Sequence, residues 1–221
     1  MEIKPFQHSV YDHLDGKDFV LALTSPRRSL ILKELGFSFR VVGSNFPEDL
    51  DKASMAPRDY VLQTAIGKGK AVWDELSLKG ETPYLILSAD TVVECDGKIF
   101  EKPRSKEHQT EVLKFFRDSQ IPQQVMTAVV LIRRDDAQAC GYRMETMVEV
   151  SIEIMDSPEN ISDDFIARYV DTNEGASVAG GYQLLGMGAL MVKEIRGDYR
   201  NVLGLPFRTT FKLIEKILIS T

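Results

Sequence analysis

The stretch Leu21-Ala-Leu-Thr-Ser-Pro-Arg-Arg28 joins a short apolar run to a helix that starts with two arginines. Residues Phe19 to Leu23 predict a buried strand, and the Thr-Ser pair before the proline can cap the helix. A helix start exposes unpaired N–H groups, and Arg27 and Arg28 add charge where an anion would bind, with Ser25 beside them. The stretch therefore predicts a phosphate pocket, although an ordinary capped helix with solvated arginines has the same sequence pattern.

Outward from this stretch, apolar periodicity predicts helices and strands that interleave along the whole chain. The expected helices cover 29–35, 58–78, 105–117, 163–170 and the residues from 209 onward. The expected strands cover 19–23, 37–42, 84–95, 98–100, 125–133, 143–154 and 189–195. Asp96-Gly97 predicts a hairpin turn. This order favours an α/β fold with a mixed sheet. We expect an N-terminal extension over 1–18 and one domain over 19–221.

Composition limits the classes of function. The chain has 221 residues, of which 43% are hydrophobic and 27% charged, enough for a large core. Its net charge of -6 argues against broad binding to nucleic acid or to an anionic membrane, and no apolar run is long enough to span a bilayer. Two cysteines without a signal-like segment favour a reducing compartment, so we expect a cytoplasmic protein. Three scattered histidines are too few for a histidine-based metal site.

One carboxylate, Asp90, interrupts the apolar strand Leu85-Ile-Leu-Ser-Ala-Asp-Thr-Val-Val93. Burying a single aspartate is unfavourable unless a cation, a metal or hydrogen bonds compensate. Asp90 is therefore either a cap at a strand bend or a functional acid, and we favour the acid. Thr91 is expected to point to the opposite face of the strand.

Three further charged residues could complete such a site. Lys68 lies inside the expected long helix, Lys102 follows the hairpin, and Glu48 lies in an acidic loop. Each has an ordinary alternative as a solvated surface charge. Together with Asp90, however, they form a mixed basic and acidic set, and carboxylates with phosphate oxygens are what a magnesium or manganese ion binds.

The order of these motifs resembles the Maf family, the septum-formation-inhibitor-like nucleotide pyrophosphatases. The resemblance runs from about Phe19 to Phe207 and also includes Glu101-Lys-Pro, Ala179-Gly-Gly-Tyr182 and Gly197-Asp-Tyr-Arg-Asn-Val-Leu-Gly-Leu-Pro206. It implies the fold of the inosine triphosphate pyrophosphatases: an elongated mixed sheet flanked by helices, with two lobes around a cleft, commonly as a homodimer. It also implies hydrolysis of a nucleoside triphosphate to a monophosphate and pyrophosphate with a divalent metal cation, Mg, Mn or Co.

The resemblance also implies roles for individual residues. Asp90 matches the family's general base, and Glu48 would form a metal pair with it. Arg27, Lys68 and Lys102 match positions that hold the triphosphate, where they would neutralise charge on the phosphate oxygens and the leaving pyrophosphate.

Ser25 and Arg28 are implied as supporting donors in the same loop. For base selectivity, the family branch that acts on thymidine and uridine triphosphates has arginine, threonine and glutamine at the positions of Arg27, Thr91 and Leu185. Leu185 departs from that glutamine and removes an amide that could bind a base edge. Gln183 could replace it if the loop is reshaped. Other departures from the family pattern, none of which removes a catalytic charge, are Leu23, Glu101 and Gly69.

The sequence thus predicts a nucleoside triphosphate pyrophosphatase that acts on pyrimidine (dTTP or UTP) or modified nucleotides. One alternative is a nucleotide-binding regulator linked to cell division that senses its ligand without turnover. Another is a metal-dependent phosphatase that releases orthophosphate. Retention of Asp90 with its basic partners favours catalysis, because a sensor needs no general base. Tyr182 is compatible both with stacking on a base and with packing in the core.

Overall fold

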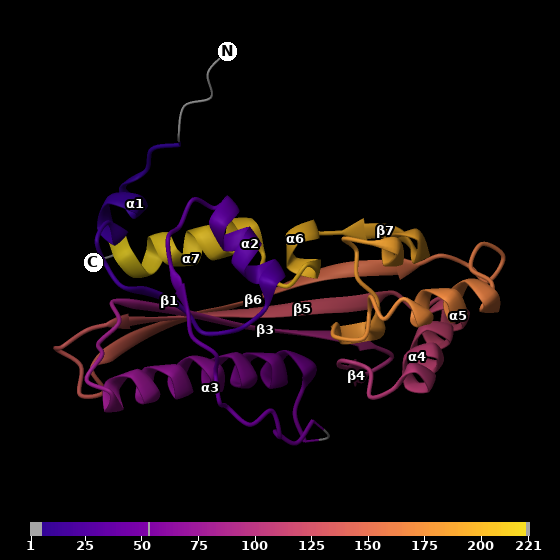
Figure 1. The fold of residues 1–221 in the computed structure, drawn as a ribbon, viewed down its shortest axis with the longest axis horizontal. Coiled ribbons are helices and arrows are strands. Elements are labelled where there is room, and N and C mark those ends of the chain that lie inside the picture. The colour runs from indigo at the N-terminus through magenta and orange to yellow at the C-terminus, as the bar shows by residue number, and fades with distance from the viewer. Residues whose placement is uncertain (1–5, 53, 220–221) are drawn as a thin grey trace, which may run out of the picture.

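One mixed sheet of seven strands runs along the molecule in the computed structural model, which describes residues 6–52 and 54–219 (Figure 1). Its order is β2-β1-β3-β5-β6-β7, and β4 also pairs with β3. The strands are β1 (Phe19–Leu21), β2 (Arg40–Val41), β3 (Leu85–Cys95), β4 (Lys98–Phe100), β5 (Gln123–Arg134), β6 (Tyr142–Met155) and β7 (Val192–Arg196). Strands β1, β2 and β3 are parallel, whereas β3, β5, β6 and β7 pair antiparallel. The predicted mixed α/β fold is confirmed.

Helices cover both faces and one end of this sheet (Figure 1). They are α1 (Ser9–Leu14), α2 (Pro26–Glu34), α3 (Pro57–Leu78), α4 (Lys106–Ser119), α5 (Asp163–Asp171), α6 (Tyr199–Val202) and α7 (Phe207–Ile219), with short 3-10 segments η1 (Ala179–Gly181) and η2 (Met187–Met191). The long helix α3 lies on one face, α2 and α7 lie on the other, and α4 with α5 lie at the far end.

The long strands form where the sequence has its longest apolar runs. Strand β3 pairs with β5 from Leu85 to Glu94, and β5 pairs with β6 along its whole length. The predicted hairpin turn is confirmed, because Asp96 and Gly97 both have positive φ angles, 53° and 72°. Several strands are shorter than expected. Strand β1 ends at Leu21, β2 pairs only with β1 and has two exposed residues, and β7 begins after a 3-10 turn.

Two buried clusters form the core, one on each face of the sheet. On the α3 face, Val61 and Val72 pack against Ile86 and Ile132. Gly69 allows the helix to approach closely, because a Cβ atom there would lie 2.7 Å from the Ser88 hydroxyl oxygen. The opposite face packs under α2, α4, α5 and α7. The close approach at Gly69 matters for the site, because it brings the preceding residue of α3 onto the edge of β3.

The segment before β1 is ordered against the C-terminal helix in the described part of the chain. Val10 is fully buried, and the Tyr11 hydroxyl donates to the carbonyl of Leu35 at 2.7 Å. The Tyr11 ring also contacts Phe37 and Phe211. Although the sequence predicted a polar extension here, α1 packs on the domain. The predicted division at residue 18 stays a prediction.

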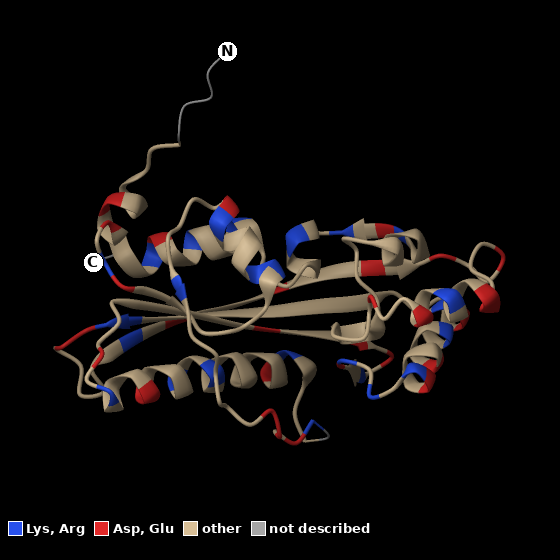
Figure 2. Ribbon diagram, viewed as in Figure 1, with Lys and Arg blue, Asp and Glu red and all other residues tan. Residues whose placement is uncertain are grey.

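Charged residues lie mainly on the helices and loops, whereas the middle of the sheet is almost free of them (Figure 2). Among the described residues, no helix is both long and apolar enough to cross a membrane. The carboxylate in the middle of β3 is therefore an exception in its surroundings.

Candidate active site

A gap in the pairing of β3 opens the sheet at its centre. On the edge away from β5, β3 pairs with β1 through Leu85–Leu87 and with β4 through Val93–Cys95. The residues between, 88–92, have no strand on that edge. A cavity of about 670 Å³ lies against this gap. One side of the cavity is formed by β1 with α2 and α3, and the other by β4 with η1. These two sides correspond to the two lobes expected around a cleft.

The start of α2 faces this cavity, as the phosphate-pocket interpretation requires. Ser25 is the N-cap residue, and its side chain makes no capping hydrogen bond. Pro26 follows at the first helical position, so the first N–H groups of α2 remain free of a side-chain cap. Both residues line the cavity. This helix start can therefore donate hydrogen bonds to an anion.

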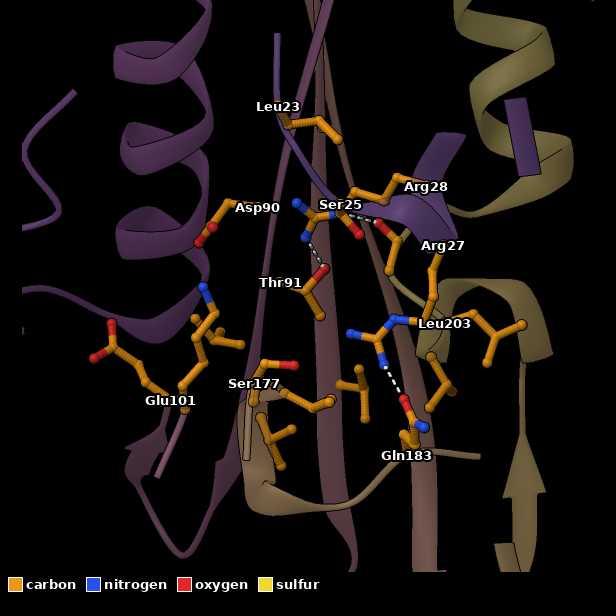
Figure 3. Close-up of a pocket in the computed structure, with 18 of the residues that line it drawn as sticks. Leu23, Ser25, Arg27, Arg28, Asp90, Thr91, Glu101, Ser177, Gln183 and Leu203 are labelled. Atoms are coloured by element: carbon orange, nitrogen blue, oxygen red, sulfur yellow. Dashed lines mark hydrogen bonds between the residues drawn. The ribbon is translucent and has the colours of Figure 1, made fainter. Parts of the chain in front are cut away.

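The two arginines of α2 do different things. Arg28 donates through Nε to the Gly204 carbonyl at 2.7 Å, through Nη1 to the Ala89 carbonyl at 2.9 Å, and through Nη2 to the Thr91 hydroxyl at 2.8 Å (Figure 3). Arg27 makes a single bond, from Nη1 to Gln183 Oε1 at 3.2 Å. Burial lowers the pKa of both guanidinium groups. Arg28 therefore holds the loops together, whereas most donors of Arg27 remain for a ligand.

Lys68 connects the two carboxylates that the sequence singled out. Its ammonium lies 2.8 Å from Asp90 Oδ1 and 2.9 Å from Glu48 Oε1. The Lys68 and Asp90 side chains are each 12% exposed, whereas Glu48 is 49% exposed. Burial raises the pKa of Glu48, but the Lys68 bond and the charges of Lys68, Lys102 and Arg28 outweigh it, so the pKa is lowered overall. Asp90 and Glu48 are thereby held together at one end of the cavity.

Thr91 and Asp90 point to opposite faces of β3, as strand periodicity predicted. Figure 3 shows Asp90 on the side of α3, and Thr91 with Arg28 on the other side. The Thr91 hydroxyl also bonds that of Thr127 at 2.9 Å. The cavity reaches both faces because the strand edge is open between β1 and β4. Lys102 lines the same cavity, and its charge acts on Glu48, whose pKa it helps to lower.

Glu101, which replaces the family's usual glycine, ties the loop that carries Glu48 to the hairpin. It forms an ion pair with Lys52 and accepts a hydrogen bond from the Tyr60 hydroxyl at 2.8 Å. Burial, together with the Glu101 contact, raises the pKa of Tyr60. This tie keeps Glu48 near Lys68.

Leu185 does not line this cavity. It is 52% exposed and lines a smaller hollow of about 130 Å³ together with Leu30 and Tyr199. Gln183, two residues earlier, lines the main cavity and binds Arg27. The structure thus brings together eight of the nine residues predicted for the site and places Leu185 apart. Whether Leu185 contacts a substrate stays a prediction.

The carboxylates of Asp90 and Glu48, which pair with Lys68, supply too few ligands to bind a hard divalent cation alone. Substrate oxygens would have to complete its coordination. The described residues include no group of three or more His, Cys, Asp or Glu side chains placed to hold a metal. Mg²⁺ commonly takes one or two carboxylates and completes its shell with water and phosphate oxygens. The pair Asp90 and Glu48 therefore fits a metal that binds with a triphosphate.

Sequence reasoning missed Glu153, a fourth acid in the cavity wall. It is 1% exposed, and its Oε2 lies 2.5 Å from the hydroxyl of Tyr182, which also lies 2.7 Å from Gln123 Oε1. Tyr182 is itself buried and packs edge-on against Phe116, so the core interpretation of this residue holds, although it also lines the cavity. A lone acid between Ile152 and Ile154 was the available signal, although it shares one face of the strand with Glu149 and Glu145.

Glu153 makes stability depend on pH. Burial raises its pKa from 4.5 to about 7, against the opposing hydrogen bond from Tyr182. Between these values the folded protein holds a proton that the unfolded chain has lost. The contribution of Glu153 to the free energy of unfolding is therefore complete below pH 4.5 and declines by about 3 kcal/mol as the pH rises to about 7.

Urea denaturation of the wild type and Glu153→Gln across this range measures that decline. We expect the stability advantage of the wild type over the variant to shrink by about 3 kcal/mol, because glutamine cannot titrate. Parallel pH profiles for the two proteins would contradict the shifted pKa.

Comparison with known proteins points to one family. The family model described as Maf-like protein matches residues 18–217. The dTTP/UTP pyrophosphatase of Schizosaccharomyces pombe is 38% identical over 213 residues, which cover 95% of this chain and 88% of that protein. The proteins of the same name from Saccharomyces cerevisiae and Dictyoglomus turgidum are 36% and 34% identical, over 88% and 90% of this chain and 88% and 96% of theirs.

Among solved structures, the Ham1 protein of Staphylococcus aureus aligns with a TM-score of 0.37 and 14% identity, over 63% of this chain and 72% of that one. That similarity is too low to support an argument about the site. The family match and the sequence relatives agree with the motif order from which the resemblance was inferred.

Proposed function

The chain belongs to the Maf-like protein family, and from this membership and the geometry of the site we propose that it is a nucleoside triphosphate pyrophosphatase. It hydrolyses a pyrimidine nucleoside triphosphate to the monophosphate and pyrophosphate. The relatives named dTTP/UTP pyrophosphatase support thymidine and uridine triphosphates as its substrates. The observation that carries the proposal is the position of Asp90, on an open strand edge beside Lys68 in a cavity lined by basic side chains.

In this mechanism a water molecule attacks the α-phosphorus through its oxygen. As it does so, Asp90 accepts a proton from that water. The bond from that phosphorus to the bridging oxygen breaks, and pyrophosphate leaves. Lys68 holds one oxygen of Asp90 at 2.8 Å and so keeps the other available for the water. Arg27, Lys102 and the start of α2 stabilise the charge that builds on the phosphate oxygens.

We further propose that Asp90 and Glu48 hold a divalent cation, Mg, Mn or Co, bound with the triphosphate. Such a cation supplies Lewis-acid stabilisation of the phosphate charge. Both carboxylates contact the Lys68 ammonium, which brings them close together at one end of the cavity. A cytoplasmic homodimer that binds no nucleic acid is part of the same proposal, and it rests on the family resemblance and the composition.

A hydrolysis panel tests this function. We expect the protein to release pyrophosphate from dTTP or UTP in the presence of Mg, Mn or Co, and to lose this activity when EDTA removes the metal. Readouts for pyrophosphate and for orthophosphate run in parallel separate the proposal from its rivals. Orthophosphate as the first product would support a phosphatase, and nucleotide binding without any product would support the regulator.

A further inference from the structure

One acid in the cavity wall has no charged partner. Four carboxylates line the cavity, and three of them form ion pairs with lysines: Glu48 and Asp90 with Lys68, and Glu101 with Lys52. The fourth, Glu153, has no ion pair in the described part of the chain, although it is 1% exposed. Its Oε1 is buried without a hydrogen-bond partner among the described residues. A buried polar atom of this kind is unfavourable unless a ligand completes its bonding.

The hydrogen bonds around Glu153 are compatible with its neutral form. The Tyr182 hydroxyl has a single proton, yet it lies within bonding distance of both Glu153 Oε2 and Gln123 Oε1. Both contacts are satisfied if Glu153 is protonated, because it then donates to Tyr182, which donates to Gln123. The raised pKa of Glu153 agrees with this arrangement. Oε1 is then left as a carbonyl-type acceptor.

The place of Glu153 in the sheet separates it from the phosphate chemistry. Asp90 is opposite Ala128 on β5, whereas Glu153 is opposite Gln123, five residues farther along that strand. At a rise of about 3.4 Å per residue, the two acids are about 17 Å apart along the strands. Glu153 is thus excluded from the metal pair and from contact with the attacking water.

Apolar side chains also line the cavity, namely Val93, Val125, Val178, Ala179 and Leu184. Val125 pairs with Val93 on β3 and with Ser151 on β6, two residues before Glu153, so part of this apolar lining lies at the Glu153 end. Apolar walls with a few placed polar atoms are typical of a site for a flat heterocycle.

We propose that Glu153 is a specificity residue that reads the pyrimidine ring, its Oε1 accepting the imide N3–H of uracil or thymine. Cytosine is rejected, because its unprotonated N3 is itself an acceptor and would face Oε1 without a proton between them. This inference rests on the proposed function and assigns the base end of the same cavity. Tyr182 and Gln123 are positioning residues: their chain of hydrogen bonds fixes Oε2, so that Oε1 is the oxygen left for the ring.

The test compares UTP with CTP. We expect the wild type to prefer UTP in kcat/KM by about 100-fold. In Glu153→Gln the amide can turn either its oxygen or its N–H toward the ring, so the preference falls below about 10-fold, mainly through a gain with CTP. In Glu153→Leu the acceptor is gone, so UTP loses its advantage and the ratio approaches one. The triphosphate of 3-methyluridine, which lacks the N3–H, is expected to be as poor as CTP with the wild type.

Glu149→Gln is the matched control. Glu149 lies on the same strand and accepts a hydrogen bond from Thr209 at 2.6 Å, and it does not line the cavity. This variant is expected to keep the UTP preference of the wild type. Thermal unfolding shows whether each variant is folded. If Glu153→Leu does not fold, the UTP to CTP ratio of the isosteric Glu153→Gln variant alone tests the inference.

Binding measurements separate this inference from the proposed function. Titration with the α,β-imido analogues of UTP and CTP, which are not cleaved at that bond, reports base preference without turnover. A preference that disappears in Glu153→Gln supports the inference even if no pyrophosphate is ever released. A folded Glu153→Gln that keeps the wild-type ratio, in binding and in kcat/KM, overturns the inference and leaves Glu153 a purely structural acid.

Discussion

Replacing Asp90 by asparagine is expected to lower kcat for pyrophosphate release by about 10³-fold. Asparagine keeps the size of the side chain and an oxygen that can accept from Lys68, so the strand edge and the cavity should persist. It cannot accept a proton, however, and the attacking water loses its base. Because Arg27, Lys102 and the start of α2 are untouched and Glu48 remains as a carboxylate for the metal, we expect nucleotide affinity to change by only a few fold. Steady-state kinetics with a pyrophosphate readout, together with titration of an uncleaved analogue, measure both quantities.

Asp96→Asn is the control for this prediction. It makes the same chemical change six residues away, in an exposed hairpin turn whose positive φ of 53° asparagine tolerates. Its kcat should match that of the wild type. If Asp90→Asn retained most of the activity, Asp90 would be a structural acid paired with Lys68, and the base would have to be sought elsewhere.

Replacing Arg28 by methionine is expected to lower the free energy of unfolding by about 3 kcal/mol. The guanidinium is half-buried at the cavity wall and joins three separate segments through Gly204, Ala89 and Thr91. Methionine fills similar space but leaves two carbonyls and a hydroxyl without that donor. Arg28→Lys is expected to recover only part of the loss, because one ammonium cannot reproduce three bonds of a planar group. Urea denaturation gives the free energies.

Arg27→Met provides the matched comparison one residue away. Arg27 makes one bond of 3.2 Å, to Gln183, so its loss should change stability by less than about 1 kcal/mol. Its effect should appear instead as a higher KM for the nucleotide. Equal destabilisation by the two methionine variants would show that the bonds of Arg28 do not hold the loops together.

The different roles of Arg27 and Arg28 could not be predicted from the motif Ser-Pro-Arg-Arg. Both arginines follow a helix start, and both were expected to serve an anion. Which of them donates to protein oxygens depends on where Gly204 lies, 176 positions later in the chain. Helix periodicity gives the direction of a side chain on its own helix but not the oxygens that another segment brings to it.

Leu185 and Glu153 illustrate the same limit for the base end of the cavity. The family resemblance drew attention to Leu185 as the position of a specificity glutamine, yet the turn carries it outside the cavity and leaves Gln183 inside. Glu153 lies in no motif that the sequence singled out. Tyr182 packs against it, and this contact, 2.5 Å between the hydroxyl and Oε2, joins segments 29 positions apart.

The sequence by itself determined the element order, the mixed α/β class, the hairpin at Asp96-Gly97 and the acid in β3, because periodicity, turn chemistry and a lone buried charge are local properties. Only the tertiary structure decided that the edge of β3 is unpaired at the site. The β3 edge is free at Asp90 because β1 and β4 pair on either side of it and leave residues 88–92 uncovered. Such pairing joins backbone groups that are distant in sequence, and it depends on lengths and registers that no local pattern encodes.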